Sequence, residues 1–285
     1  MTSPRTLLNA WNLKPRKRLG QNFLSDPAAA AAIAAKARLF PHDVVVEIGA
    51  GLGALTIPVA RMVKKVYAIE KDRQLIGLLQ TELLANRIDN CDIMAEDILP
   101  MDLGQFHRTG EPKLIVMGNL PYNISSQVLI KLIHSRDIVE RAILMFQQEL
   151  AQRITAAPGN KQYGRITAML SYCAEIKPLT HAAASVFYPQ PKVDSTVVAI
   201  RFTSTSRYEN HDETMLYRVI KAAFGNRRKT LKNSLAASEL HISPRTASRA
   251  LETAQIDPSR RAETLTPAEF VALEIGLRKV MDGNT

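Results

Sequence analysis

The chain contains few of the residues that build disulfide-stabilised or metal-binding proteins. Its only two cysteines among 285 residues, Cys91 and Cys173, lie far apart in apolar runs. This pattern argues against a disulfide framework and indicates a reducing compartment. The six histidines are scattered without the spacing of metal ligands, so the sequence predicts no metal site.

Long apolar runs are also absent. The best candidate for a membrane span, residues 28–35, is alanine-rich and ends at Lys36, whereas a spanning helix needs about 20 apolar residues. The N-terminus lacks the apolar core and cleavage site of a secretory signal, so we expect a cytoplasmic protein without membrane contact. Hydrophobic residues make up 46% and charged residues 22% of the chain, which excludes wholesale disorder.

Acidic residues are missing from two segments. Residues 1–25 contain five basic residues and residues 216–233 contain six, and neither segment contains an acidic one. The rest of the chain is almost balanced, so these segments account for the net charge of +10. Two separate basic patches favour binding to a polyanion, above all nucleic acid, over an evenly solvated surface.

The middle of the chain alternates strand and helix patterns. Runs of apolar and β-branched residues predict buried strands, and the segments between them have helical spacing. Repeated β-α units predict a Rossmann-like α/β fold, with a parallel sheet and helices on both faces. The expected strands are 44–48, 66–69, 91–95, 114–117 and 142–146, with closing strands at about 174–183 and 195–202.

The two ends of the chain differ from this middle. Residues 1–25 have the pattern of an irregular basic arm, after which Asp26 is expected to cap a helix. Beyond a linker at about 203–206 only helical patterns remain, and the last of them opens with a capping box at Thr266. The predicted domains are a basic N-terminal arm (1–25), an α/β domain (26–205) and a small all-helical C-terminal domain (206–285).

A glycine-rich loop follows the first predicted strand. Gly49, Gly51 and Gly53 come directly after Glu47-Ile48, where they allow a tight turn and close approach to a ligand. The same loop fits the fingerprint of dinucleotide-binding proteins. By itself it therefore does not decide between a nicotinamide cofactor and another ligand that carries adenosine.

Polar residues end the next three predicted strands. Glu70 suits a ribose hydroxyl, Asp97 can accept a hydrogen bond from an adenine amino group, and Asn119 ends the fourth strand. The carboxyl ends of parallel strands meet at one edge of a sheet, where open α/β sheets bind ligands. The series therefore predicts an adenosine-bearing cofactor held across several strands.

Asn119-Leu120-Pro121-Tyr122 resembles the signature of amino-methyltransferases that use S-adenosylmethionine. The motif suits adenine, whose N6 lone pair is delocalised into the ring and is a poor nucleophile. The Asn119 side-chain oxygen and a carbonyl near Leu120 would accept both N6 hydrogens, Pro121 would fix the backbone, and Tyr122 would stack on the base. Direct displacement would follow, with proximity and orientation as the main catalytic effects.

Further matching segments run almost from end to end of the chain. Through them the sequence resembles the ribosomal RNA adenine N6,N6-dimethyltransferase family, close to its bacterial small-subunit branch. The resemblance implies dimethylation of N6 on two adjacent adenosines near the 3′ end of small-subunit (16S) rRNA, in ribosome biogenesis. The segments are 17–24 (Lys-Arg-Leu-Gly-Gln-Asn-Phe-Leu), 47–56, 119–126, 148–149 with Arg153, 163–165, 187–195 and 223–231.

The resemblance also implies roles for individual residues. Phe187 would form the second face of an adenine sandwich opposite Tyr122. The residues expected to contact the cofactor are Asn22, Leu24, Gly49, Gly51, Gly53, Glu70, Asp97 and Asn119. The residues expected to bind RNA are Lys17, Arg18, Arg227, Arg228 and Lys229.

Three other functions remain open at this point. Related large-subunit rRNA methylases, which confer macrolide resistance, share the glycine loop and the Asn-Leu-Pro-Tyr type of signature. A non-enzymatic assembly factor would bind immature small subunits, and a hydride-transfer enzyme would use the same glycine loop. We expect the small ribosomal subunit and its rRNA as partners, S-adenosylmethionine as methyl donor, no metal, and a monomer.

Overall fold

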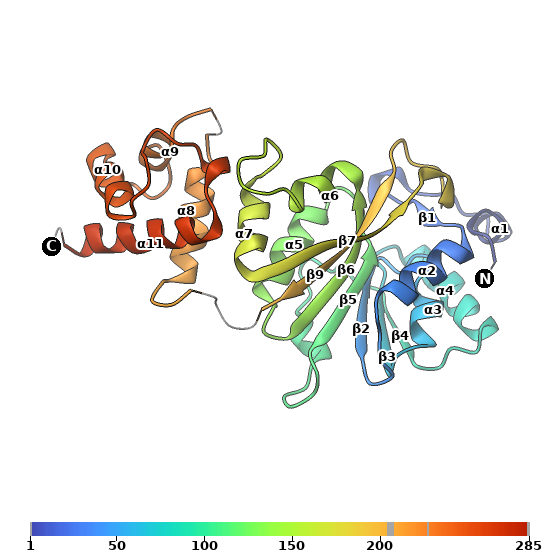
Figure 1. Cartoon of the computed structure of the whole chain (residues 1–285). Helices are drawn as coiled ribbons and strands as arrows, with labels where there is room; N and C mark the ends of the chain where they lie inside the picture. Colours follow the sequence, from blue (N-terminus) through green and yellow to red (C-terminus); the bar gives the residue numbers. More distant parts are fainter. Residues whose placement is uncertain (1, 204–207, 227, 284–285) are drawn as a thin grey trace. The chain divides into compact units, whose positions relative to one another are not determined.

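The computed structural model describes residues 2–203, 208–226 and 228–283, and the chain divides into two compact units (Figure 1). Unit 1 comprises Met1–Ala151 and Ile176–Phe202, and unit 2 comprises Gln152–Glu175 and Thr203–Thr285. The domain boundary expected at 205/206 lies outside the described residues. Residues 152–175, which we expected in the α/β domain, group with the C-terminal helices.

A seven-stranded sheet forms the centre of unit 1, in the order β4-β3-β2-β5-β6-β9-β7. The strands from β4 to β6 are parallel, and β9 runs antiparallel to β6. The predicted α/β fold and its strands are confirmed, but the sheet is mixed rather than purely parallel. The strands are β2 (Val44–Ile48), β3 (Lys65–Ile69), β4 (Cys91–Met94), β5 (Leu114–Asn119), β6 (Val139–Gln147), β7 (Ala174–Ala182) and β9 (Ser195–Phe202).

Helices between the strands cover the sheet of unit 1. On one face, Ile33 and Ile57 pack in a core with Val45, Ile115 and Met117 from the strands. The first of these helices begins as predicted, because the Asp26 side chain accepts a hydrogen bond from the Ala28 N–H at 2.8 Å. The helices are α2 (Pro27–Lys36), α3 (Thr56–Ala60), α4 (Arg73–Ala85), α5 (Ser125–His134) and α6 (Gln148–Ile154), with short 3-10 turns η2 (Leu103–Phe106) and η3 (Ala184–Val186).

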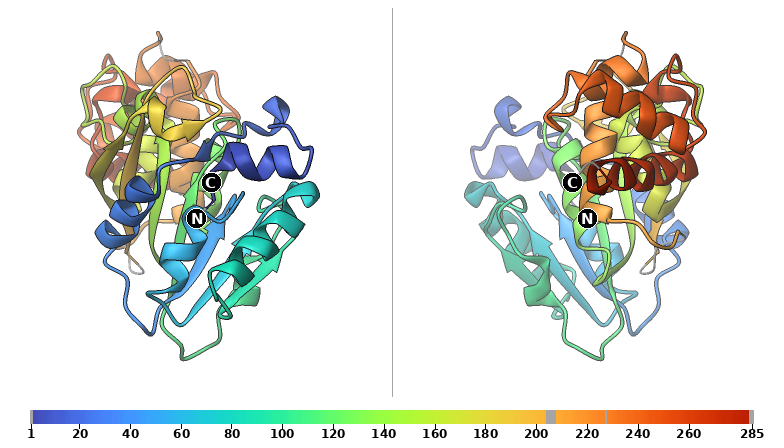
Figure 2. Two further views of the ribbon diagram at one scale, coloured as in Figure 1. Left: turned by 90° about the vertical axis from the view of Figure 1, so that its right-hand side faces the viewer. Right: turned by 90° about the vertical axis from the view of Figure 1, so that its left-hand side faces the viewer.

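The N-terminal segment is ordered, contrary to the expectation of an irregular arm. Its elements are α1 (Pro4–Ala10), the 3-10 turn η1 (Lys17–Leu19) and β1 (Phe23–Leu24), which pairs antiparallel with β8 (Phe187–Tyr188). Leu7 and Leu8 of α1 pack with Leu75 and Leu78 of α4 in a separate apolar cluster. The ribbons of α1 and α4 are drawn in Figures 1 and 2. Burial of these leucines stabilises a segment whose own sequence is too short and polar to fold alone.

Unit 2 is helical, as predicted for the C-terminal part of the chain. The capping box of its last helix is confirmed, since Thr266 N–H donates to Glu269 Oε2 at 2.8 Å and Glu269 N–H donates to Thr266 Oγ1 at 3.2 Å. The helices are α7 (Arg165–Cys173), α8 (Glu213–Ala223), α9 (Leu231–Ala236), α10 (Pro244–Thr253) and α11 (Pro267–Asp282), with the 3-10 turn η4 (Ala262–Thr264).

Aromatic packing explains why residues 152–175 belong to unit 2. Tyr163 is fully buried, and its ring centroid lies 6.2 Å from that of Phe224, which in turn lies 6.0 Å from Phe270. Gly159 N–H also donates to the Glu263 carbonyl at 2.7 Å. These contacts join positions about 45 to 105 residues apart, which a local sequence pattern does not report. None of the helices in the described ranges has the length and apolar character needed to cross a bilayer.

Candidate functional site

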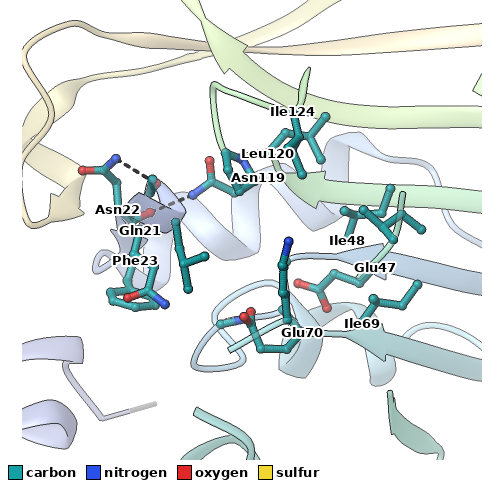
Figure 3. A pocket seen from close by; sticks show the side chains of 18 of the residues that line it. Gln21, Asn22, Phe23, Glu47, Ile48, Ile69, Glu70, Asn119, Leu120 and Ile124 are labelled. Atoms are coloured by element: carbon teal, nitrogen blue, oxygen red, sulfur yellow. Dashed lines mark hydrogen bonds between the residues drawn. The ribbon is translucent and has the colours of Figure 1, made fainter. Parts of the chain in front are cut away.

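A cavity opens at the carboxyl ends of the central strands of unit 1, where the strand order reverses. β2 and β5 are neighbours in the sheet, but β2 is followed by β3 on one side of the pair and β5 is followed by β6 on the other side. The connections that leave these two strands therefore run in opposite directions. Open α/β sheets bind ligands at such a point. The cavity is lined by residues 19–24, 47–52, 54–55, 69–71, 96–98 and 119–124 (Figure 3).

The glycine loop forms the floor of this cavity. Gly49 and Gly51 have φ values of +74° and +58°, which residues other than glycine rarely adopt. A Cβ at Gly51 would lie 3.2 Å from the Phe23 ring, so the glycine lets the N-terminal segment approach closely. Gly53 does not line the cavity; a Cβ there would lie 3.0 Å from Leu79 Cδ1, so its place is in the packing against α4.

Glu70 is held rigidly at the end of β3. Gly51 N–H donates to its Oε2 and Asp72 N–H donates to its Oε1, each at 2.8 Å. Burial raises the pKa of the Glu70 carboxyl, and these backbone hydrogen bonds oppose that rise. Each carboxylate oxygen has a further lone pair, so Glu70 can still accept hydrogen bonds from the hydroxyl groups of a ligand.

Glu47 lies beside Glu70 in the cavity wall (Figure 3) and is only 3% exposed. Burial raises the pKa of Glu47 to about 8; the Thr56 hydroxyl opposes the rise and the Glu70 carboxylate adds to it. Its Oε2 atom has no hydrogen-bond partner among the described residues. Glu47 is therefore largely a neutral acid at pH 7. From the sequence, Glu47 was expected only to mark the start of the glycine loop, although a single acid in a β-branched run is a signal of burial.

Asp97 pairs with a lysine that the sequence analysis missed. Lys71 Nζ lies 2.6 Å from Asp97 Oδ2, and Leu99 N–H donates to Asp97 Oδ1 at 3.0 Å. Partial burial acts to raise the pKa of Asp97, but the Lys71 and Leu99 contacts outweigh it and the pKa is lowered. Asp97 is therefore an ionised acceptor at the cavity edge, which suits a hydrogen bond from an amino group.

The orientation of the Asn119 side chain is fixed by the N-terminal segment. Asn119 Nδ2 donates to the Asn22 carbonyl at 2.9 Å (Figure 3). A carbonyl only accepts, so the amide nitrogen must face Asn22 and Oδ1 must face away. Within the described part of the chain, no donor bonds to Asn119 Oδ1 or to the Leu120 carbonyl, so two acceptors remain available in adjacent residues.

The loop after Asn119 is short and closed. Ile124 N–H and Ser125 Oγ both donate to the Pro121 carbonyl, at 3.2 and 3.1 Å, and so tie the loop to the start of α5. Tyr122 is half-buried and lines the cavity. Phe187 is not on the cavity wall; it lies in β8, pairs with Leu24 and is 5% exposed. The stacking role of Phe187 opposite Tyr122 therefore stays a prediction.

The N-terminal segment supplies a complete wall of the cavity. Asn22 and Leu24 line it, as the resemblance implied, and so do Gln21 and Phe23, which the sequence analysis did not assign. The Gln21-Asn22 pair was only a weak sequence signal of a cavity wall, because its hydrogen-bond partners Asp72 and Asn119 lie far away in sequence.

The basic residues expected to bind RNA lie on the surfaces of both units. Lys17 and Arg18 are exposed on η1, and Arg228 and Lys229 are exposed ahead of α9. Their side chains form no hydrogen bond or ion pair with any described residue. Arg227 lies outside the described residues. Across the described ranges, no group of three or more His, Cys, Asp or Glu side chains is placed to hold a metal ion.

A family model described as ribosomal RNA adenine dimethylase matches residues 12–279. The chain belongs to the ribosomal RNA adenine dimethylase family. Membership confirms the predicted family and enzyme class: this is an rRNA adenine dimethyltransferase with a Rossmann-like methyltransferase sheet. It also disfavours the hydride-transfer alternative left open by the glycine loop.

Similar proteins agree over almost the whole length. Ribosomal RNA small subunit methyltransferase A of Desulforapulum autotrophicum is 50% identical over 97% of each chain. The protein of the same name from Myxococcus xanthus is 38% identical over 97% of this chain and 96% of its own. The crystal structure of a dimethyladenosine transferase from Plasmodium falciparum covers 91% of this chain and 98% of its own, with 25% identity and a TM-score of 0.77. The fold is also shared by the 23S rRNA methyltransferase ErmE, with a TM-score of 0.66 and 24% identity over 90% of this chain and 100% of that one.

Proposed function

We propose that this family member transfers methyl groups from S-adenosylmethionine to N6 of two adjacent adenosines near the 3′ end of small-subunit (16S) rRNA. The acceptor is supported by the dimethylase family and by relatives named for the small subunit, which match nearly end to end. The proposed setting is ribosome biogenesis in the cytoplasm, with a monomeric enzyme acting on the small subunit.

The cavity residues suit S-adenosylmethionine. Bound there, it would supply an electrophilic methyl group on a sulfonium centre. The free lone pairs of Glu70 suit ribose hydroxyls, and the ionised Asp97 suits the exocyclic amino group of the adenine. Ile69 and Ile98 give the same region apolar walls. Gly49 lets the chain turn tightly beside the cavity, because its φ of +74° is one that residues with a side chain rarely adopt.

The observation that carries the proposal is the fixed amide of Asn119. Because Nδ2 is bonded to the Asn22 carbonyl, Oδ1 is available beside the Leu120 carbonyl. Together these acceptors can bind both hydrogens of an adenine N6 amino group. Such binding withdraws the N6 lone pair from the ring and directs it toward an electrophile, which is catalysis by orientation.

Tyr122 and the basic surface residues would position the adenine and its RNA. The proton on N6 can leave without a dedicated proton-accepting side chain. Tyr122 offers an aromatic face at the cavity mouth on which a flipped-out adenine can stack. After methyl transfer the N6 nitrogen is cationic and sheds a proton readily, so the Asn119 and Leu120 oxygens need only hold the N–H groups until water accepts it. The cations Lys17, Arg18 and Arg228 are exposed, and we expect them to contact phosphate.

The acceptor is tested with labelled methyl donor and four acceptors: unmethylated small subunits, large subunits, naked rRNA and DNA. Label at two adjacent adenosines of small-subunit rRNA, recovered as N6,N6-dimethyladenosine, is expected. Label on large-subunit RNA would instead assign the macrolide-resistance activity. Cofactor binding without labelling of any acceptor would leave only the assembly-factor function.

The Asn119 mechanism has its own test. Asn119→Ala removes one N6 acceptor and the bond to Asn22, and we expect methyl transfer to fall about 100-fold. Asn160→Ala is the matched control, because Asn160 is an exposed amide in unit 2 whose Oδ1 only accepts from Gln162 N–H. Full methyl transfer by Asn119→Ala would contradict the proposal.

A further inference from the structure

A buried aspartate joins the N-terminal segment to the cofactor cavity. Asp72 is 3% exposed and caps α4 by accepting from Gln74 N–H at 3.2 Å. Its Oδ1 also accepts from Arg16 Nη1 and its Oδ2 from Gln21 Nε2, each at 2.8 Å. Its own N–H donates to Glu70 Oε1 at 2.8 Å. One residue therefore holds both the segment and the carboxylate that faces the cavity.

The segment is tied together around this contact. Arg16 N–H donates to Gln21 Oε1 at 2.7 Å, which fixes the Gln21 amide with its nitrogen toward Asp72. The next residue, Asn22, receives the hydrogen bond from Asn119 at 2.9 Å. Residues 16–22 thus connect Asp72 on one side of the cavity with the proposed catalytic amide on the other.

The only tryptophan of the chain reports on the same segment. Trp11 follows α1, and its Cζ3 and Cη2 atoms lie 3.0 Å from the position that a Cβ on Gly77 of α4 would occupy. The indole therefore lies directly on the α4 backbone, although 47% of the residue is exposed. Undocking of the segment would remove this contact and expose the indole further.

We propose that Asp72 is a positioning residue that couples docking of residues 11–24 on α4 to binding of S-adenosylmethionine in the cavity. The proposal rests on the proposed function, since it names a residue that acts through Glu70 and the N-terminal wall. The physical reason is that Asp72 is buried and its carboxylate compensates one cation and one amide donor at once. An asparagine at position 72 carries no charge to pair with the Arg16 guanidinium. Its NH2 group would also face the NH2 group of Gln21, so that two donors would meet.

Coupling of this kind is reciprocal. If a docked segment improves binding of the donor, a bound donor must stabilise the docked segment by the same factor. Asp72 needs no contact with the ligand for this effect, because it holds the residues that line the cavity. The expected signature is weaker binding with a nearly unchanged rate once the cavity is filled.

Asp72→Asn in the full-length protein tests the proposal. Asparagine caps helices as well as aspartate does, so α4 is preserved. We expect the calorimetric Kd for S-adenosylmethionine to rise about tenfold, which is about 1.4 kcal/mol. KM for the donor should rise similarly, while kcat at saturation stays within about twofold. Without ligand, acrylamide should quench Trp11 fluorescence more in the variant than in the wild type, and S-adenosylmethionine should reduce that difference.

A second substitution supplies the rescue. In the Asp72→Asn background, Gln21→Glu restores an acceptor opposite the new amide and a negative charge near Arg16, and its Oε1 can still accept from Arg16 N–H. Binding and quenching should return toward the wild-type values. Asp212→Asn is the matched control, because Asp212 caps α8 in unit 2 by accepting from Met215 N–H and so tests the same change at a helix cap outside the segment.

The outcomes separate this inference from the function on which it rests. Wild-type affinity and wild-type Trp11 quenching in Asp72→Asn would overturn the inference. If Asp72→Asn does not fold, Gln21→Ala tests the same contact without altering the cap, and unchanged quenching there would overturn it as well. Failure of the wild type to bind S-adenosylmethionine would refute the proposed function, and the ligand-free quenching would still show whether Asp72 docks the segment.

Discussion

Replacing Glu47 by glutamine should change how the stability of unit 1 depends on pH. Glu47 is buried, and its pKa is raised from an ordinary value of 4.5 to about 8. Between these two values the native state keeps a proton that the unfolded chain has lost. Stability from this group is therefore fully present below about pH 4.5, falls as the pH rises, and is lost above about pH 8.

The size of the effect follows from the two pKa values. At about 1.4 kcal/mol per pH unit, the wild type should lose about 4 kcal/mol of stability between pH 5 and pH 9 through this one group. Glu47→Gln has nearly the shape of the protonated acid and no proton to lose. The variant should match the wild type within about 1 kcal/mol at pH 5 and exceed it by about 4 kcal/mol at pH 9.

The assay is urea denaturation at both pH values, followed by Trp11 fluorescence. Trp11 is the only tryptophan and belongs to unit 1, which also contains Glu47, so the signal reports the relevant unit. The difference between variant and wild type cancels the contributions of groups that titrate in both proteins. A difference that is the same at pH 5 and pH 9 would refute the reasoning, because it would show that Glu47 is already ionised in the native state at pH 5.

Two further variants test the sheet and the basic surface. A Cβ at Gly118 would lie 2.4 Å from the Ile48 carbonyl of the neighbouring strand, so Gly118→Ala should cost about 2–3 kcal/mol and lower Tm by about 5–10 °C. Gly104→Ala, where the Cβ meets only a side-chain carboxylate at 3.2 Å, is the control, and an equal Tm in both would contradict this. Arg228→Ala combined with Lys229→Ala should reduce the salt dependence of small-subunit binding, by about one unit of log K per log salt for each lost phosphate contact, without changing the affinity for S-adenosylmethionine. An unchanged slope would place both cations outside the RNA interface.

Local signals in the sequence were sufficient for many individual elements of both units. Asp26 caps its helix and Thr266 opens the last one because both interactions involve residues two or three positions away. The run at 44–48 is a strand because three consecutive valines favour a buried sheet. Glu70 and Asn119 come together because parallel strands end at one edge, a rule that needs only the strand assignment.

The same reasoning was insufficient wherever distant residues determine the structure. Residues 2–24 contain no strong local pattern, and their order depends on α4, on β8 and on Asp72. Phe187 is buried through its pairing with Leu24, a contact that no local pattern reports. In each case the decisive partner lies more than 45 positions away, and a local propensity carries no information about it.

Charge explains why the cavity residues were predicted only in part. Glu70 and Asp97 were found because polar residues at strand ends are conspicuous, but their states differ. Backbone N–H groups hold Glu70 in a buried site that raises its pKa, whereas Lys71 keeps Asp97 ionised. A sequence shows identical carboxyl groups at these positions. Burial raises the pKa of Glu70, and the neighbouring Lys71 helps to lower the pKa of Asp97. The burial and the position of the lysine are both properties of the fold.

The arrangement of the cavity has a consequence for how a methyltransferase of this kind selects its target. Its N-terminal wall contacts Asp72 on the donor side and the Asn119 amide on the acceptor side, through residues 16–22. The orientation of Asn119, and so the acceptor for an adenine amino group, therefore depends on the same segment that encloses the donor. A chain in which this segment is displaced loses both the enclosure and the oriented amide, because the Asn22 carbonyl leaves with it. With the proposed roles of Glu70 and Asn119, binding of the donor and recognition of the adenine would be joined through seven residues that the sequence alone presents as a basic arm.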